Sequence, residues 1–401
     1  MVKVGGRAII PAMRILTVDI GTGTQDIFLY DSALDLENGF KLVMPSPTMM
    51  VHRRLKAATH RREAVLLTGY LMGGGPSQWA ARDHLRAGAA LYATPAAART
   101  FNDDLDFVQK DMGVQLVSED EARALPAQVL RLELKDFDFP LMAQAFANFG
   151  LTLEPDAVAV AVFDHGDSPP GYSDRQFRFD YLAERINAAQ SVRARPGVSL
   201  LSTFAHRAEA IPASMTRLRA VAQAARAQGL GVPLMVMDTA PAAVLGAALD
   251  PRVAENIPGG ALIANVGNFH CLVFRLSGRG LDGLFEHHTG ELTRARLEGF
   301  ITALADSSLQ HADVFDDMGH GALVYEARPM PAPRFLAVTG PRRSLLRGSR
   351  HDPYLAVPYG DMMLAGCFGL LAAMADVYPE LAEAIRASLA GAEGAAPWEA
   401  G

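Results

Sequence analysis

The sequence predicts an α/β protein built as two related lobes. Residues 15–31 read as an apolar strand, a polar turn and a second strand, ILTVDIGTGTQDIFLYD, which indicates a β-hairpin. The same organisation returns about 250 positions later, in the strand ALIANV, the turn GNFH and the strand CLVFRL over 261–276. Buried strands alternate with helices elsewhere in the chain, which is typical of α/β sheets.

Composition favours a soluble globular protein. The 401 residues are 50% apolar and 20% charged, enough for two separate cores. The net charge of −7 argues against nucleic acid and anionic membranes as partners. The longest apolar run, 362–375, is too short to span a bilayer and is expected to be a buried helix. Residues 1–12 lack a signal-peptide pattern and are expected to be an N-terminal extension.

The two cysteines exclude one kind of chemistry. Cys271 and Cys367 lie in apolar runs 96 positions apart. Radical enzymes that hold an iron–sulfur cluster use three closely spaced cysteines, so we expect neither such a cluster nor a disulfide. A reducing cytoplasm is the expected setting.

The first hairpin carries groups that suit a phosphate. Gly21 and Gly23 let backbone amides approach an anion closely, and Thr22 and Thr24 add hydroxyl donors. Asp19 ends a buried strand, where a carboxylate needs a partner, and a hydrated Mg²⁺ held through water is one candidate. The alternative is an ordinary Gly-Thr turn capped by Asp19.

The next elements extend this lobe. Residues 41–47 read as an edge strand ended by prolines, and 64–68 as a buried strand. The glycine-rich turn GYLMGGGPSQ then leads into a helix that begins near Ser77. Amides at such a helix start are a candidate anion site, although three glycines also make plain tight turns. Short strands at 91–93 and 114–117 and a short helix at 119–125 follow.

The strand at 157–163, AVAVAVF, ends at Asp164 and His165. Open α/β sheets bind ligands beyond the carboxyl ends of their strands, so these two side chains are site candidates; an ordinary loop capped by Asp164 is the alternative. Residues 175–228 have a helical pattern and are expected to form a helical subdomain. Asp238 follows the strand at 233–237 and starts a helix as its cap.

Later elements complete the second lobe. A helix runs to about residue 304, and a strand at 334–339 ends at Gly340 and Pro341 before an arginine cluster. The predicted organisation is an extension over 1–12, lobe I over 13–245 with the helical subdomain inserted, lobe II over 246–360, a helix over 361–380 that packs back on the core, and a flexible tail over 388–401.

With these elements in order, the chain resembles the superfamily of actin, sugar kinases and heat-shock chaperone ATPases. In that superfamily two ribonuclease-H-like lobes clasp a nucleotide. VDIGTGTQDIFLYD resembles its first phosphate hairpin, IANVGNFHCLVFRL the second, DTAPAAVLGAALD the linking helix and AVTGPRR the adenosine turn. Asn265 stands where the second hairpin usually has an aspartate.

More closely, the span from Arg14 to Met374 is similar to a family of prokaryotic proteins labelled pyruvate formate-lyase activating proteins. The shared motifs are DIGTGTQD, LTGYLMGGGP, VFDHGDSPP, VMDTAPAAVLGA, NVGNFH, FEHHTGELT, DMGHGA, VTGPRR and VPYGDMMLAGCFG.

The superfamily resemblance implies an ATP-dependent enzyme that uses Mg-ATP. Its reaction would be phosphoryl transfer to a small molecule, or ATP hydrolysis that serves the activation of a client enzyme. Asp19 would hold Mg²⁺ through water, and Asp238 would activate a hydroxyl or water. The implied phosphate and nucleotide contacts are Gly21, Thr22, Gly23, Thr24, Gly267, Asn268 and Gly340.

Two other hypotheses stay open. One is a metal-dependent enzyme, because imidazole with carboxylate suits Zn²⁺ or Fe²⁺ and several such residues lie at strand ends. The other is a ligand-binding regulatory protein without turnover, with Arg342 and Arg343 holding an anion. The candidates for the metal cluster are Asp164, His165, His270, His287, His288, Asp317 and His320, with Asn265 as a further cleft residue.

Overall fold

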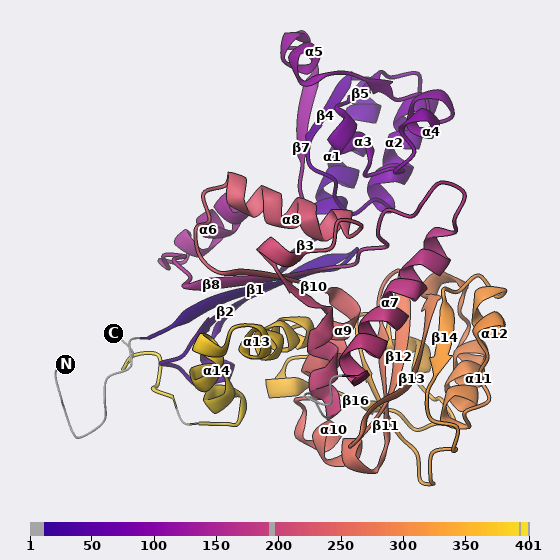
Figure 1. Ribbon diagram of the computed structural model, residues 1–401. Helices are drawn as coiled ribbons and strands as arrows, with labels where there is room; N and C mark the ends of the chain where they lie inside the picture. The colour runs from indigo at the N-terminus through magenta and orange to yellow at the C-terminus, as the bar shows by residue number, and fades with distance from the viewer. Residues whose placement is uncertain (1–11, 192–196, 393, 400–401) are drawn as a thin grey trace.

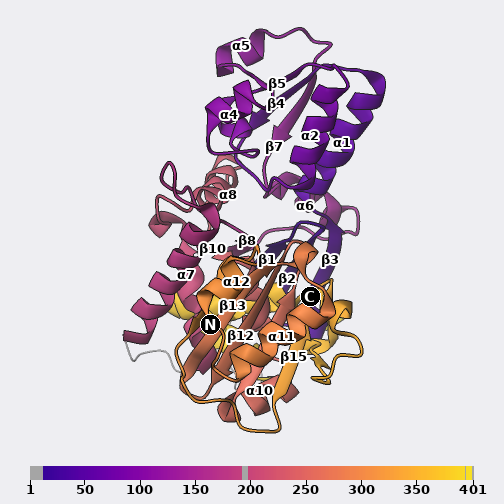
Figure 2. The same ribbon diagram turned by 90° about the vertical axis from the view of Figure 1, so that its right-hand side faces the viewer.

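The computed structural model describes residues 12–191, 197–392 and 394–399, arranged around two six-stranded sheets and one four-stranded sheet (Figures 1 and 2). The predicted N-terminal extension lies outside the described residues, apart from residue 12.

The first sheet belongs to lobe I and has the strand order β3-β2-β1-β8-β10-β9. The predicted hairpin is present, and β2 pairs antiparallel with β1 so that Asp26 lies opposite Asp19. On the other side of β1, β8 and β10 run parallel to it. All six residues of β8 are buried, as expected for the continuous apolar run of a central strand. The strands are β1 (Arg14–Ile20), β2 (Thr24–Asp31), β3 (Phe40–Pro45), β8 (Ala157–Val162), β9 (Ala205–Arg207) and β10 (Leu234–Asp238).

The second sheet repeats this plan with the order β14-β13-β12-β11-β15-β16. Here β11 has the antiparallel neighbour β12 on one side and the parallel neighbour β15 on the other. The prediction of a two-lobed α/β fold with duplicated ribonuclease-H-like sheets is therefore confirmed by strand order and direction. The strands are β11 (Ala261–Val266), β12 (His270–Ser277), β13 (Gly280–His288), β14 (Gly321–Val324), β15 (Phe335–Thr339) and β16 (Tyr354–Leu355).

An inserted α/β unit follows β3 and stands above lobe I (Figures 1 and 2). Its four strands are all parallel, in the order β6-β5-β4-β7, and its apolar side chains form a core of their own. The elements are α1 (Pro47–Arg61), β4 (Val65–Gly69), α2 (Pro76–Arg86), β5 (Leu91–Ala93), α3 (Pro95–Ala98), α4 (Leu105–Lys110), β6 (Gln115–Leu116), α5 (Glu119–Ala124) and β7 (Leu130–Leu134).

The insertion therefore differs from the helical subdomain predicted over 175–228. That range holds α7 (Asp174–Ser191), η2 (Gly197–Phe204), β9 and α8 (Thr216–Ala227). Helix α8 packs on β8 and β10, and α7 packs on β14 of the other lobe. These helices cover the sheets because their apolar side chains, such as Leu182 and Leu218, complete the main core.

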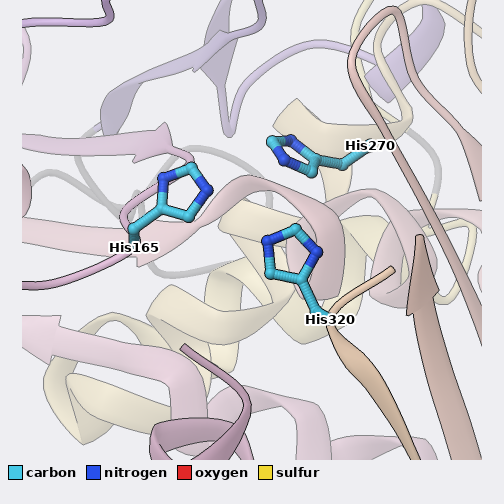
Figure 3. A group of neighbouring side chains, drawn as sticks. All are labelled: His165, His270 and His320. Atoms are coloured by element: carbon cyan, nitrogen blue, oxygen red, sulfur yellow. The ribbon is translucent and has the colours of Figure 1, made fainter. Parts of the chain in front are cut away.

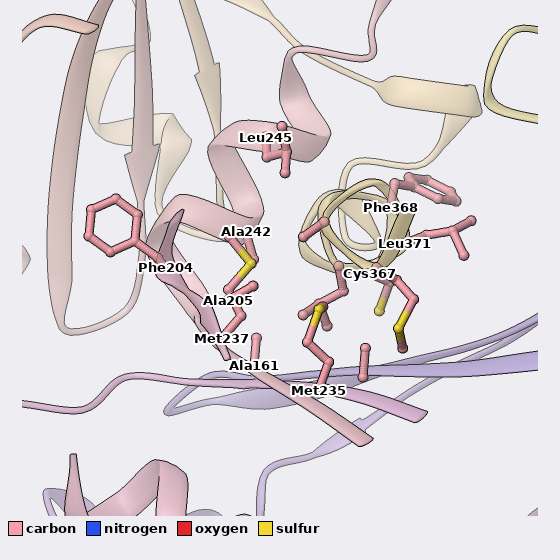
Figure 4. Close-up of a cluster of buried hydrophobic side chains, with 14 of the residues drawn as sticks. Ala161, Phe204, Ala205, Met235, Met237, Ala242, Leu245, Cys367, Phe368 and Leu371 are labelled. Carbon is pink, nitrogen blue, oxygen red and sulfur yellow. The ribbon is translucent and has the colours of Figure 1, made fainter. Parts of the chain in front are cut away.

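Two helices form the layer between the lobes. Helix α9 (Thr239–Ala247) follows β10 and packs on β11 and β15, while α13 (Ala365–Val377) packs on β1 and β8. They cross in close contact at Gly246 and Gly369, where an added Cβ would lie 1.7 Å from Ala365 O and 1.8 Å from Ala242 O. Figure 4 shows the surrounding core, with Cys367, Phe368 and Leu371 of α13 above Ala161 of β8 and Met235 of β10.

The remaining helices cover the outer faces of the lobes. No helix in the described part of the chain is long and apolar enough to cross a membrane. Helix α14 extends to Leu389, and Ala395 forms a β-bridge with Leu34, so part of the range predicted as a tail contacts lobe I. These helices are α6 (Phe139–Ala147), α10 (Pro251–Asn256), α11 (Arg294–Ala305), α12 (His311–Phe315) and α14 (Ala382–Leu389).

Candidate functional site

A cleft of about 1260 Å³ opens between the inserted unit and the two lobes. The inserted unit contributes residues 73–75 and 99–106, the loop after β8 contributes 163–172, and the second hairpin contributes Phe269 and His270. Phe269 also stacks on Trp79 of α2, with ring centroids 5.6 Å apart, so the inserted unit touches the tip of the second hairpin.

Three histidines converge on one point beside this cleft. His165 lies just after β8, His270 starts β12, and His320 comes directly before β14. Each offers a ring nitrogen that lies within 4.8 Å of the other two. Figure 3 shows the three rings around a common space. The lobes place them there because the carboxyl end of β8 and the turn end of the second hairpin face each other.

The ring nitrogens lack ordinary partners. His270 Nε2 and both nitrogens of His320 are buried and accept or donate no hydrogen bond to any residue that the structure describes. Buried polar atoms usually have partners, so unpaired nitrogens that face one another point to a missing ligand. Removal from water, with Arg178 nearby, lowers the pKa of His165 to about 3, and burial holds the pKa of His270 and of His320 well below the usual value. The three imidazoles are neutral, which is the form that binds metals.

Neighbouring rings surround the three histidines. Phe163 stacks on His270 with ring centroids 3.8 Å apart and a 2° interplanar angle. The ring of His288 lies 4.7 Å from that of His320, and its Nδ1 is 2.7 Å from the carbonyl oxygen of Met318. The carbonyl can only accept, so Nδ1 of His288 carries the proton and Nε2 the lone pair.

A buried ion network lies behind this cluster. Arg178 of α7 is fully buried; it pairs with Asp238 of lobe I and, through Nε at 3.3 Å, with Glu286 of lobe II. Its guanidinium also lies 4.3 Å above the ring centre of Phe163. Burial raises the pKa of Glu286 to about 7, while the charge of Arg178 opposes the rise. Arg178, Glu286 and Phe163 are absent from the sequence-based candidates. Arg178 lies on a polar helix, where a charged residue is expected at the surface.

Several predicted candidates lie apart from the cluster. His287 points to the other face of β13, where its Nε2 is 3.2 Å from Asp317. Asp164 accepts hydrogen bonds from the amides of Gly166 and Leu218, both at 2.9 Å, so it shapes the loop beneath His165. Asp238 is 1% exposed and caps α9 through the amide of Ala240, as predicted from its position.

The predicted phosphate hairpins face each other across a second, smaller cavity of about 100 Å³. A Cβ built on Gly23 would lie 2.5 Å from Asn268 Nδ2, so the two turns touch. Pockets for small organic ligands typically have about 300–1,000 Å³. A nucleoside triphosphate therefore does not fit between the hairpins as they stand. The predicted residues that line this cavity are Asp19, Gly21, Thr22, Thr24, Asn265, Gly267, Asn268 and Gly340.

Two buried carboxyl groups lie side by side in this small cavity. Asp19 accepts a hydrogen bond of 2.5 Å from Thr239, and a Cβ on Gly366 would lie 1.9 Å from its Oδ2. Asp26 Oδ1 has no hydrogen-bond partner within the described ranges. Burial raises the pKa of Asp19 to about 7, and burial with the neighbouring Asp19 raises that of Asp26 to about 8. The pair suits a shared proton or a small cation.

The raised pKa of Asp26 predicts how stability depends on pH. An unfolded aspartate ionises near pH 4, whereas the folded group keeps its proton up to about pH 8. The ionisation of Asp26 therefore contributes a loss of stability as pH rises from about 4 to 8. The Asp26→Asn variant cannot ionise at this position, so its free energy of unfolding relative to that of the wild type should rise across this window, by on the order of 5 kcal/mol between pH 4 and pH 8. Urea unfolding of both proteins in the presence of chelator at pH 4.5, 6 and 8 tests this prediction. A difference in unfolding free energy between variant and wild type that does not change with pH would contradict it.

The chain is similar to solved structures at low sequence identity. No curated protein matches the sequence. Among solved structures, an exopolyphosphatase-like protein is 10% identical with a TM-score of 0.22, over 82% of this chain and 66% of that one. A second solved structure is a nucleotide-free acetone carboxylase, from work on the mechanism of ATP-dependent acetone carboxylation. It is 10% identical with a TM-score of 0.21, and the match covers 68% of this chain and 45% of that one. The chain spans less than two thirds of either protein, and likenesses this low carry no functional conclusion.

The sequence itself matches one family. The match covers residues 72–345, which is more than half of the chain, and the family is described as "Putative pyruvate format-lyase activating enzyme (DUF1786)". This agrees with the resemblance drawn from the motifs between Arg14 and Met374. The protein belongs to this family.

Proposed function

We propose that this protein is a metal-dependent enzyme whose metal ion is held by His165, His270 and His320 beside the large cleft. The observation that supports this is the convergence of three neutral imidazoles, of which His270 and His320 have buried nitrogens without partners among the described residues. An ion bound by the three imidazoles would give a partner to one nitrogen of each ring. Without an ion, burying them unpaired costs about 1–3 kcal/mol each.

The ligand set indicates which ions suit the site. Three histidines with an open fourth position are a known arrangement for catalytic Zn²⁺, and imidazole also suits Fe²⁺. A metal held there would supply a Lewis acid to a ligand in the cleft. His288, with its lone pair on Nε2, is the candidate to accept or return a proton next to it.

Metal analysis of protein purified without a histidine tag tests the proposal. We expect about one zinc or iron ion per chain, removed by chelator and restored by added metal. Removal should also lower the melting temperature, because the ligands come from both lobes and binding stabilises the folded state. Protein that holds no stoichiometric metal, and takes up none from micromolar Zn²⁺, Fe²⁺ or Co²⁺, would exclude this function.

An ATP-dependent reaction is the second candidate. It is supported by the two hairpins, which bring Asp19 and Thr22 to the same small cavity as Gly267 and Asn268. In this case the hairpins would separate to admit Mg-ATP, Asp19 would hold Mg²⁺ through water, and the phosphoryl acceptor would be a small molecule, water or a client enzyme's substrate. Calorimetric titration with Mg-ATP, followed by a phosphate-release assay, tests it; the absence of binding in wild type would remove it and leave the metal proposal intact.

A further inference from the structure

We propose that Glu286 is a positioning residue for the metal site: its free carboxylate oxygen accepts a hydrogen bond from Nδ1 of His320 and thereby directs Nε2 of that ring to the ion. This inference rests on the proposed function. It gives a partner to two unpaired buried atoms that an ion on Nε2 would leave without one, Oε1 of Glu286 and Nδ1 of His320.

Backbone pairing holds the two residues together. Glu286 lies in β13 opposite Gly321, the first residue of β14, and the amide of His320 donates to the carbonyl oxygen of Glu286 at 2.9 Å. Both side chains are 0% exposed. Oε1 of Glu286 and Nδ1 of His320 are 3.9 Å apart, and neither atom has a hydrogen-bond partner in the part of the chain that the structure describes.

The other carboxylate oxygen is already anchored. Oε2 of Glu286 accepts from Nε of Arg178 at 3.3 Å, and Arg178 is held in turn by Asp238 and by the carbonyl oxygen of Asp164, the latter at 3.1 Å. Since Oε2 is occupied, Oε1 is the atom left to receive His320. A change of about 1 Å brings the pair to a normal N–H···O distance of 2.7–3.2 Å.

Such a hydrogen bond has a defined effect on a metal ligand. It places the proton of His320 on Nδ1, so Nε2 carries the lone pair, and it makes the imidazole a stronger donor. His288 has an equivalent arrangement through the carbonyl oxygen of Met318. One hydrogen bond would thus pair a buried donor with a buried acceptor. The two atoms are 3.9 Å apart, and neither has another partner among the described residues.

The chain contains a matched control. Asp317 is also a carboxylate beside a histidine of this sheet, 3.2 Å from Nε2 of His287, but that pair lies outside the cluster. Glu286→Gln should lower the affinity for Zn²⁺ about 10–100-fold and alter the absorption spectrum of the Co²⁺ form. Asp317→Asn should leave the Zn²⁺ affinity and the Co²⁺ spectrum as in the wild type.

The experiment is a chelator-competition titration of each full-length protein with Zn²⁺, together with Co²⁺ spectra. If the wild type binds no metal, the proposed function fails and this inference fails with it. If the wild type binds and Glu286→Gln has the same affinity and spectrum, only the role of Glu286 is overturned. Glu286→Asp serves if Gln disturbs folding: it retains the charge beside Arg178 but withdraws the carboxylate from His320, so unchanged affinity and spectrum in this variant would equally overturn the inference.

Discussion

Zinc affinity is expected to fall at least about 100-fold when His320 is replaced by alanine, because the change removes one of the three proposed ligands. His320 is fully buried, and both of its ring nitrogens are unpaired within the described residues, so the one side-chain hydrogen bond at stake is the proposed bond to Glu286. Competition with a chromogenic zinc chelator measures the affinity, and the melting temperature with and without zinc measures the coupling to stability.

His287→Ala is the control for this prediction. It removes an equally buried imidazole, but one that lies on the other face of β13 and pairs with Asp317. It should lower stability without changing zinc affinity by more than a few fold. Equal losses of zinc binding in the two variants would mean that the effect arises from unfolding, and would count against the three-histidine site.

Gly369→Ala is expected to destabilise the protein by about 3 kcal/mol or more. The new Cβ would lie 1.8 Å from the carbonyl oxygen of Ala242 in α9, far inside any permitted contact. Backbone cannot rotate away as a side chain can, so α9 and α13 must move apart and open the core between the lobes. The gain in helix propensity from glycine to alanine, about 1 kcal/mol, is smaller than this penalty.

Gly299→Ala shows the opposite case. Gly299 lies in α11, and a Cβ there would meet no described atom within 4 Å. This variant should be more stable than the wild type by up to about 1 kcal/mol. Denaturant unfolding of both variants measures the contrast. A Gly369→Ala protein as stable as Gly299→Ala would mean that the two helices are not packed as described.

The fold was predictable where the local pattern is strong. The hairpin over 15–31, its repeat and the apolar run of β8 gave the correct plan, because each strand is buried and uninterrupted. Strand β13 was missed, since its sequence GLDGLFEHH combines two glycines with charged residues. Tertiary contacts stabilise the strand despite this composition. A Cβ on Gly283 would lie 2.8 Å from Leu323 O, so the neighbouring strand packs closely there, and Glu286 is buried beside Arg178.

The site was predictable only in outline. The rule that ligands lie beyond strand ends indicated His165, but nothing local separates His287 from His288. Once β13 is known, strand alternation places these two side chains on opposite faces. Arg178 gave no signal, because its burial depends on Asp238 and Glu286, which are 60 and 108 positions away.

The packing of α13 on the first hairpin has a consequence for synthesis of the chain. Cys367 donates to the carbonyl oxygen of Asp26 at 3.1 Å, and Gly366 lies against Asp19, so the last long helix completes the core around β1. Protein synthesis adds about 5–20 residues per second, so α13 leaves the ribosome on the order of tens of seconds after the first hairpin. The inserted α/β unit is continuous and has its own core, so it can fold first. Lobe I is therefore completed last, although its first strand is made early.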